Sequence, residues 1–169
     1  VNIRTACENT QTAYYRVLRE AGEHEDRAVY VDSVQAAADY LDQTQGSVLL
    51  TTGSKHLPDY TKIQDYQNRA YLRLLPSPEM LQKAVDTGFL PAHLIAMQGP
   101  FSQELNVALI KQSGIGVLVT KQSGKSGGFE EKISAAEQTG TDVIVIKRPK
   151  QEDGKNLSEA EAELKKLMT

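Results

Sequence analysis

Three segments of the sequence combine glycine with hydroxyl side chains, and two of them add lysine, a combination that suits an anionic ligand. They are Thr51–Lys55, Gln98–Ser102 and Thr120–Gly128. Glycine lets the backbone approach a ligand closely, and lysine brings a full positive charge. Each segment is also predicted to precede a helix N-terminus, where free N–H groups favour negative charge. The three segments therefore predict an anion-binding site.

The third segment contains Gly124-Lys125-Ser126 between a strand-like run and a helical pattern, which is the outline of a P-loop. A P-loop needs a further glycine five positions before its Gly-Lys-Ser, because that glycine begins the turn that surrounds the phosphates. Val119 stands at that position. The spacing therefore argues against a nucleotide hydrolase, and the glycine- and lysine-bearing loop needs another explanation.

Each segment taken alone also fits an ordinary strand-to-helix turn, in which serine caps the helix and glycine adopts a positive φ. Three such segments on one sheet edge favour a binding site. The residues predicted to bind cofactor or substrate are Thr52, Gly53, Lys55, Gly99, Pro100, Phe101, Ser102, Thr120, Lys121, Ser123, Gly124, Gly127 and Gly128. The sequence assigns no catalytic residue, and its histidines show no pairing typical of a metal site.

The elements that must position these loops are indicated by short apolar runs bounded by turn residues. Such runs are typical of strands buried on both faces, as in a parallel sheet. They lie at 28–31, 48–52, 71–75, 93–97, 116–120 and 143–146. Residues 14–18 are a weaker candidate.

Helical patterns lie between the apolar runs. They follow Ser33, Ser77-Pro78, Ser102 and Gly128, and a last helix is predicted from Ser158 to Met168. The alternating order predicts an α/β fold with a Rossmann-like open, mainly parallel sheet of five or six strands and helices on both faces. Residues 1–150 are predicted to form this unit, and residues 151–169 a polar loop with a C-terminal helix.

The composition restricts the partners and the compartment. The net charge of −3 argues against a nucleic-acid partner. No apolar stretch is long enough to predict a membrane helix. The single cysteine, Cys7, allows no intrachain disulfide, which fits a reducing compartment and favours the cytoplasm.

Taken in order, the loops and their flanking strands resemble the C-terminal half of the precorrin-6A and cobalt-precorrin-6A reductases of cobalamin biosynthesis. The matching segments are ACE (6–8), YRVLRE (15–20), LLTTGSK (49–55), GPFS (99–102), ELN (104–106), LVTK (118–121), SG (123–124), GG (127–128), EK (131–132), VIVI (143–146) and RP (148–149). Each match is weak alone, and the combination in this order is specific.

The resemblance implies two Rossmann-like halves with the active site between them, NADPH as cofactor and a tetrapyrrole macrocycle as substrate. Phosphates of the cofactor and carboxylates of the macrocycle both suit the predicted anion site. The Gly-Gly-Thr loop and the His-Pro-Phe/Tyr-Ala segment of the family's N-terminal half have no counterpart in this sequence. The chain is therefore expected to be the C-terminal half alone, inactive without the missing N-terminal half of the same enzyme.

Two other interpretations remain open. The same loops would serve a non-catalytic α/β module that binds an anionic metabolite or a nucleotide, which needs no second half. They would also serve an unrelated Rossmann-like enzyme such as a sugar-nucleotide transferase, although no acid/base pair is evident at the sheet edge. An upstream Gly-Gly-Thr loop would favour the reductase.

Overall fold

The computed structural model describes residues 2–14, 17, 28–122, 128–148 and 157–167. The chain divides into two compact units, one of residues 21–149 and the other of residues 1–20 with 150–169. The first unit holds all of the β-sheet and the three predicted loops.

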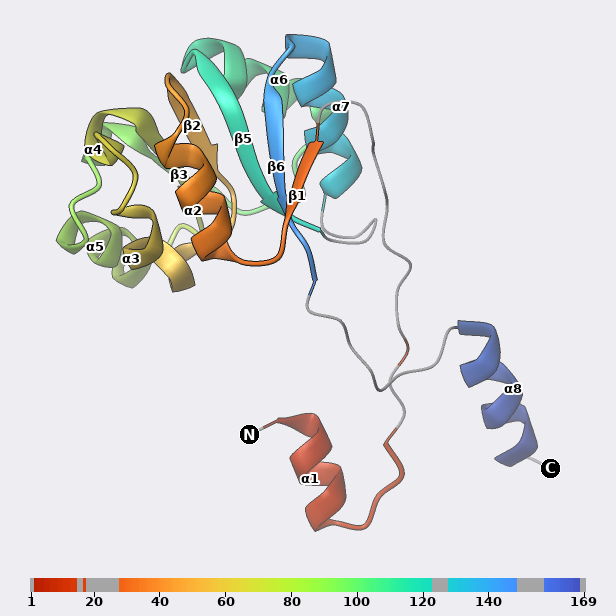
Figure 1. The fold of residues 1–169 in the computed structure, drawn as a ribbon. Coiled ribbons are helices and arrows are strands. Elements are labelled where there is room, and N and C mark those ends of the chain that lie inside the picture. Colours follow the sequence, from red (N-terminus) through yellow and green to blue (C-terminus); the bar gives the residue numbers. More distant parts are fainter. Residues whose placement is uncertain (1, 15–16, 18–27, 123–127, 149–156, 168–169) are drawn as a thin grey trace. The chain divides into compact units, whose positions relative to one another are not determined.

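The larger unit is built on a six-stranded sheet in which every neighbouring pair of strands is parallel (Figure 1). The strand order is β1-β6-β5-β2-β3-β4. The strands are β1 (Ala28–Val31), β2 (Ser47–Leu50), β3 (Ala70–Leu74), β4 (Leu94–Ala96), β5 (Ile115–Lys121) and β6 (Asp142–Ile146). The predicted fold class is confirmed, and each of the six principal apolar runs contains a strand.

Helices cover both faces of this sheet because successive strand residues point to opposite sides. Val48 and Leu50 belong to one core, and Leu49 between them belongs to the other. The first core is covered by α2 (Val34–Asp42), α3 (Leu57–Tyr60), α4 (Tyr66–Arg69) and α5 (Pro78–Asp86). The second is covered by α6 (Gln103–Gln112) and α7 (Phe129–Thr139). We call these the α2/α5 face and the α6/α7 face.

Local signals fix the ends of the longer helices. The Ser33 hydroxyl accepts a hydrogen bond from the Ala36 N–H at the start of α2, and Gly140 ends α7 with a φ of 68°. From the sequence, either Asp32 or Ser33 could cap α2 and Gly140 was expected to end α7; the structure assigns the cap to Ser33. A helix start was predicted after the loop that follows β2, and the short helices η1 (Ser54–His56), α3 and α4 lie there. Their bounds were not predicted, since residues 54–69 lack a periodic apolar pattern.

One strand begins later than its apolar run suggests. The prediction started a strand at His93, but this residue ends a short 3₁₀ helix, η2 (Pro91–His93), and β4 follows it. The His93 ring stacks on Tyr71 with 4.2 Å between ring centroids. His93 therefore packs against the sheet.

The smaller unit contributes two described helices. They are α1 (Ile3–Asn9) and α8 (Leu157–Leu167), and the second agrees closely with the helix predicted from Ser158. Most of the weaker strand candidate at 14–18 lies outside the described residues. Among the described helices, none has the length and apolar character required to cross a membrane.

The strand order places a topological switch point between β2 and β5. From β2 the chain continues outward to β3 and β4, then returns to β5 on the other side of β2 and continues to β6. In open α/β sheets, ligands bind outside the carboxyl ends of the strands at such a point. The loops after β2 and β5 flank it, and these are two of the three segments predicted to bind an anion.

Candidate functional site

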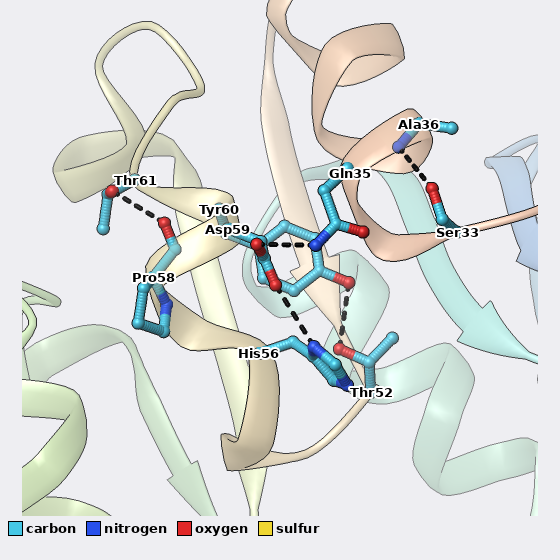
Figure 2. Close-up of polar contacts among 9 residues, drawn as sticks. All are labelled: Ser33, Gln35, Ala36, Thr52, His56, Pro58, Asp59, Tyr60 and Thr61. Atoms are coloured by element: carbon cyan, nitrogen blue, oxygen red, sulfur yellow. Dashed lines mark hydrogen bonds and ion pairs between the residues drawn. The ribbon is translucent and has the colours of Figure 1, made fainter.

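The loop after β2 turns its first polar side chain toward the α2/α5 face. The Thr52 and Tyr60 hydroxyls are 3.0 Å apart, and both side chains are buried (Figure 2). Burial raises the pKa of Tyr60 to about 12. Gly53 has a φ of 79°, which a residue with a side chain rarely adopts, and Lys55 is exposed.

Asp59 is the centre of a second polar network near this loop. Asp59 accepts from Gln35 Nε2 through Oδ1 at 2.8 Å, and its Oδ2 lies 3.1 Å from His56 Nδ1 (Figure 2). Gln35 comes from α2 and His56 from the loop region after β2, so the network joins two elements of the α2/α5 face. Each carboxylate oxygen of Asp59 has a partner, which makes this network self-contained.

The loop after β4 packs onto itself. The Gly99–Pro100 peptide bond is cis, and a Cβ at Gly99 would lie 3.0 Å from the Phe101 ring. A side chain at position 99 would therefore crowd the Phe101 ring where it folds back over the loop. The Ser102 hydroxyl accepts from the Leu105 N–H at 3.3 Å, so Ser102 is the N-cap of α6, one of the roles predicted for it.

The loop after β5 begins and ends with described residues. Thr120 is buried, Lys121 is exposed, and Gly128 is the N-cap of α7 with a φ of 62°. The predicted binding residues Ser123, Gly124 and Gly127 lie outside the described residues.

A group of buried polar side chains on the α6/α7 face was not among the predicted site residues. Arg73 of β3 is 6 % exposed, Asn106 of α6 is 2 % exposed and Lys132 of α7 is 7 % exposed. Arg73 Nη1 donates to Asn106 Oδ1 at 2.7 Å, and the Arg73 guanidinium carbon lies 4.2 Å from the centre of the Phe101 ring. We call Arg73, Asn106, Phe101 and Lys132 the cationic cluster.

Both cations of the cluster have lowered pKa values. Burial lowers the pKa of Arg73 to about 10. Burial and then the positive charge of Arg73 lower the pKa of Lys132 to about 8, against an opposing effect of Glu131. Both side chains are still mainly protonated at neutral pH, so this face holds two neighbouring positive charges.

The cationic cluster lies at the carboxyl edge of the sheet, beside two helix N-termini. Arg73 is the penultimate residue of β3, Phe101 directly precedes the N-cap of α6, and Lys132 lies in the first half of α7. The ends of two helices add partial positive charge to that of the side chains. The arrangement favours an anion such as a phosphate or a carboxylate.

The three predicted loops are positioned at the carboxyl edge of the sheet by two different arrangements. The loops after β2 and β5 follow neighbouring strands, as expected. The loop after β4 follows an edge strand, but it reaches toward the centre of the sheet because Phe101 lies over Arg73 of β3. In the described part of the chain, no three His, Cys, Asp or Glu side chains are grouped as metal ligands.

A sequence signal for the cluster was present. Arg73 lies inside the run Tyr71–Leu75, which was predicted to be a buried strand, and Lys132 is three residues from Phe129 on a predicted apolar helix stripe. A charged residue at a buried position requires a partner or a function. The neighbours of these two residues, however, are separated from them by tens of positions in the sequence.

Comparison with known proteins adds independent information. A profile of the family described as Precorrin-6x reductase CbiJ/CobK matches residues 1–166. The cobalt-precorrin-6A reductase of Priestia megaterium is 39% identical over 76% of this chain and 51% of that protein. The cobalt-precorrin-6A reductase of Methanothermobacter thermautotrophicus is 35% identical over 88% of this chain and 49% of that protein.

A solved structure is also similar. The structure of CobK precorrin-6A reductase superimposes with a TM-score of 0.74 and 27% sequence identity, over 97% of this chain and 66% of that one. The chain spans about half the length of the two curated relatives above.

Proposed function

This chain belongs to the precorrin-6x reductase family, and we propose that it is the C-terminal half of an NADPH-dependent (cobalt-)precorrin-6A reductase. In this proposal, the enzyme reduces one carbon–carbon double bond of a corrin-precursor macrocycle in cobalamin biosynthesis. Residues 1–150 form the C-terminal Rossmann-like half. A cytoplasmic location is part of the proposal, and the single cysteine fits it.

The observation that carries the proposal is the cationic cluster at the carboxyl edge of the sheet. Arg73 and Lys132 are both buried, and burial of cations costs free energy that an anionic ligand would offset. NADPH offers phosphates and the macrocycle offers carboxylates. The cluster and the three loops that follow β2, β4 and β5 are therefore assigned to binding these two ligands.

This chain has to bind and orient the reactants more than transform them. NADPH would supply the hydride, and the protein contributes position, electrostatics and exclusion of water. The buried Thr120 and the cationic cluster both belong to the α6/α7 face, which places polar groups beside the end of β5. No catalytic residue is assigned to this chain, which is compatible with a protein that binds and orients the reactants while NADPH supplies the hydride.

An N-terminal half is proposed to complete the cleft. The chain spans 51% and 49% of two reductase relatives, so those proteins contain a comparable length of additional sequence. We assign the second wall of the active site to that additional half. The isolated chain is then expected to bind ligand weakly and to lack reductase activity.

A non-catalytic module that binds an anionic metabolite is the alternative, because the cationic cluster alone suffices for it. The test compares this chain with the full-length protein that contains it. Both are titrated with NADPH, and NADPH oxidation is followed by absorbance in the presence of the macrocycle. We expect oxidation by the full-length protein only. Failure of that protein to oxidise NADPH, with tight binding of an anion retained, would favour the binding module.

A further inference from the structure

Arg73 is a buried cation whose contacts are all neutral. Its side chain is 6 % exposed, and among the described residues no carboxylate pairs with it. A buried charge usually has an oppositely charged partner, because removing an ion from water costs several kcal/mol. In this protein the countercharge of Arg73 is missing from the described structure.

The two residues that hold Arg73 form a neutral clamp. Asn106 Nδ2 donates to the Ser102 carbonyl at 2.8 Å, which fixes the orientation of the amide, because a carbonyl can only accept. The Asn106 oxygen is thereby directed at Arg73 Nη1, 2.7 Å away. The Phe101 ring covers the guanidinium at 4.2 Å, so a second neutral group limits its movement.

Much of the hydrogen-bonding capacity of Arg73 is unused. A guanidinium has five N–H donors in a planar fork, and Asn106 is the residue that Arg73 bonds within the described part of the chain. Arg69, four residues earlier, shows the contrast, since it donates to four oxygens, those of Leu41, Thr44, Gly46 and Gln64. Arg69 is satisfied by its own chain, whereas Arg73 is oriented but not neutralised.

We propose that Arg73 binds one carboxylate or phosphate of the ligand through its remaining donors, and that Asn106 and Phe101 are positioning residues whose neutrality leaves the charge of Arg73 for that ligand. Carboxylate and phosphate each present two oxygens that can accept two parallel N–H bonds from the guanidinium fork. An aspartate at position 106 would give Arg73 a countercharge in place of the ligand, although it could not donate to the Ser102 carbonyl as the amide does. The inference rests on the proposed function for the identity of the ligand, and not for its charge.

The decisive variant is Asn106→Asp in the full-length protein. It is nearly isosteric and places a carboxylate against Arg73. Binding is measured by calorimetry with NADP⁺ and, separately, with a tetrapyrrole polycarboxylate. We expect the affinity for one of the two to fall at least about tenfold, because the new carboxylate neutralises Arg73. The probe that loses affinity identifies the source of the anion.

Two further variants distinguish this role from a purely structural one. Asn106→Leu removes the amide and adds no charge, so it should weaken binding less than Asn106→Asp, although it is expected to destabilise the fold more. Arg73→Lys keeps the charge and loses the fork, and it should weaken binding of the same probe. If Asn106→Asp fails to fold, Arg73→Lys decides: unchanged affinity for both probes overturns the proposal.

An independent readout separates this inference from the reductase function. Inorganic phosphate should raise the melting temperature of the wild-type protein and raise that of Asn106→Asp much less. This result would support the anion subsite even if the protein did not oxidise NADPH. Equal protection of both proteins by phosphate, together with equal affinity for both larger probes, would show that the subsite does not exist.

Discussion

The two faces of the sheet differ in how their polar side chains are paired at the same carboxyl edge. On the α2/α5 face, Thr52 pairs with Tyr60, and Asp59 pairs with Gln35 and His56. On the α6/α7 face, the buried Arg73 contacts the neutral side chains of Asn106 and Phe101, and it lies close enough to Lys132 to lower the pKa of that lysine. One face satisfies its polar groups internally, and the other retains positive charge.

This difference separates stability from function within one sheet. Buried hydrogen bonds that are complete contribute to stability, and their removal leaves a polar group unsatisfied. Arg73 is a buried cation that pairs with no carboxylate among the described residues; such a charge reduces stability and persists where a ligand requires it. We therefore expect substitutions on the α2/α5 face to change the free energy of unfolding, and substitutions in the cationic cluster to change ligand affinity.

The largest effect is expected from Arg73→Met in the full-length protein. The change removes the charge and keeps a side chain of similar length, so the affinity for the anionic ligand should fall by about 2 kcal/mol or more. The free energy of unfolding should stay equal or increase, because an apolar side chain suits the buried site better. Calorimetric titration with NADP⁺ and the macrocycle, and denaturant unfolding, measure the two quantities.

The matched control is Arg69→Met, at the residue that directly precedes β3. Arg69 donates to four neutral oxygens, so its loss should lower stability and leave affinity unchanged. If both substitutions lowered stability alike and neither changed affinity, the contrast between the two arginines would be wrong.

Lys132→Met tests the positive charge on the α6/α7 face through the pH dependence of stability. The pKa of Lys132 is lowered from 10.5 to about 8 in the folded protein. Between these values the unfolded chain binds more protons than the folded chain, so this residue makes stability rise with pH from about 8 to about 10.5. Below pH 8 the charged side chain is destabilising, so Lys132→Met should be more stable than the wild type at pH 7, by on the order of 2 kcal/mol.

The measurement is the melting temperature of both proteins from pH 7 to pH 10. The difference between them should narrow as the pH rises, because Lys132 becomes neutral in the folded wild type. Comparison of the two proteins cancels the titration of other groups such as Tyr60, whose pKa of about 12 lies above this range. A difference that does not depend on pH would contradict the lowered pKa.

Thr52→Val tests the α2/α5 face. It removes the hydroxyl that lies 3.0 Å from the buried Tyr60 hydroxyl and keeps the shape of the side chain. The free energy of unfolding should fall by about 1–2 kcal/mol, because Tyr60 loses its partner. Denaturant unfolding gives the change, and Thr52→Ser, which retains the hydroxyl, should recover most of it. A large loss of ligand affinity with unchanged stability would instead assign Thr52 to the binding site.

The smallest effects are expected from the two serine caps. Ser33 caps α2 and Ser102 caps α6, each through its hydroxyl. Alanine at either position should lower the free energy of unfolding by about 1 kcal/mol, as measured by denaturant unfolding. Only Ser102→Ala is expected to weaken anion binding as well. The Ser102 carbonyl orients Asn106, and loss of the hydroxyl cap would loosen the turn that holds this carbonyl in place. Equal ligand affinity for the two alanine variants would limit Ser102 to a structural role.

Much of the fold was predictable because its signals are local. Short apolar runs marked each of the six strands, and serine and glycine marked the ends of α2, α6 and α7. The short helices at 54–69 were not predictable, since packing on the sheet rather than a periodic pattern stabilises them. The candidate loops were found because glycine, hydroxyl and lysine residues lie together in the sequence.

The sequence by itself determined the parallel α/β architecture and the loops that follow β2, β4 and β5, because hydrophobic periodicity and capping act over a few residues. Only the tertiary structure decided which polar groups are satisfied. The partners of Thr52 and Arg73 depend on strand order and on the face to which each side chain points. Arg73 and Asn106 are 33 positions apart in the chain and 2.7 Å apart in space, and that contact arises only when α6 packs on β3.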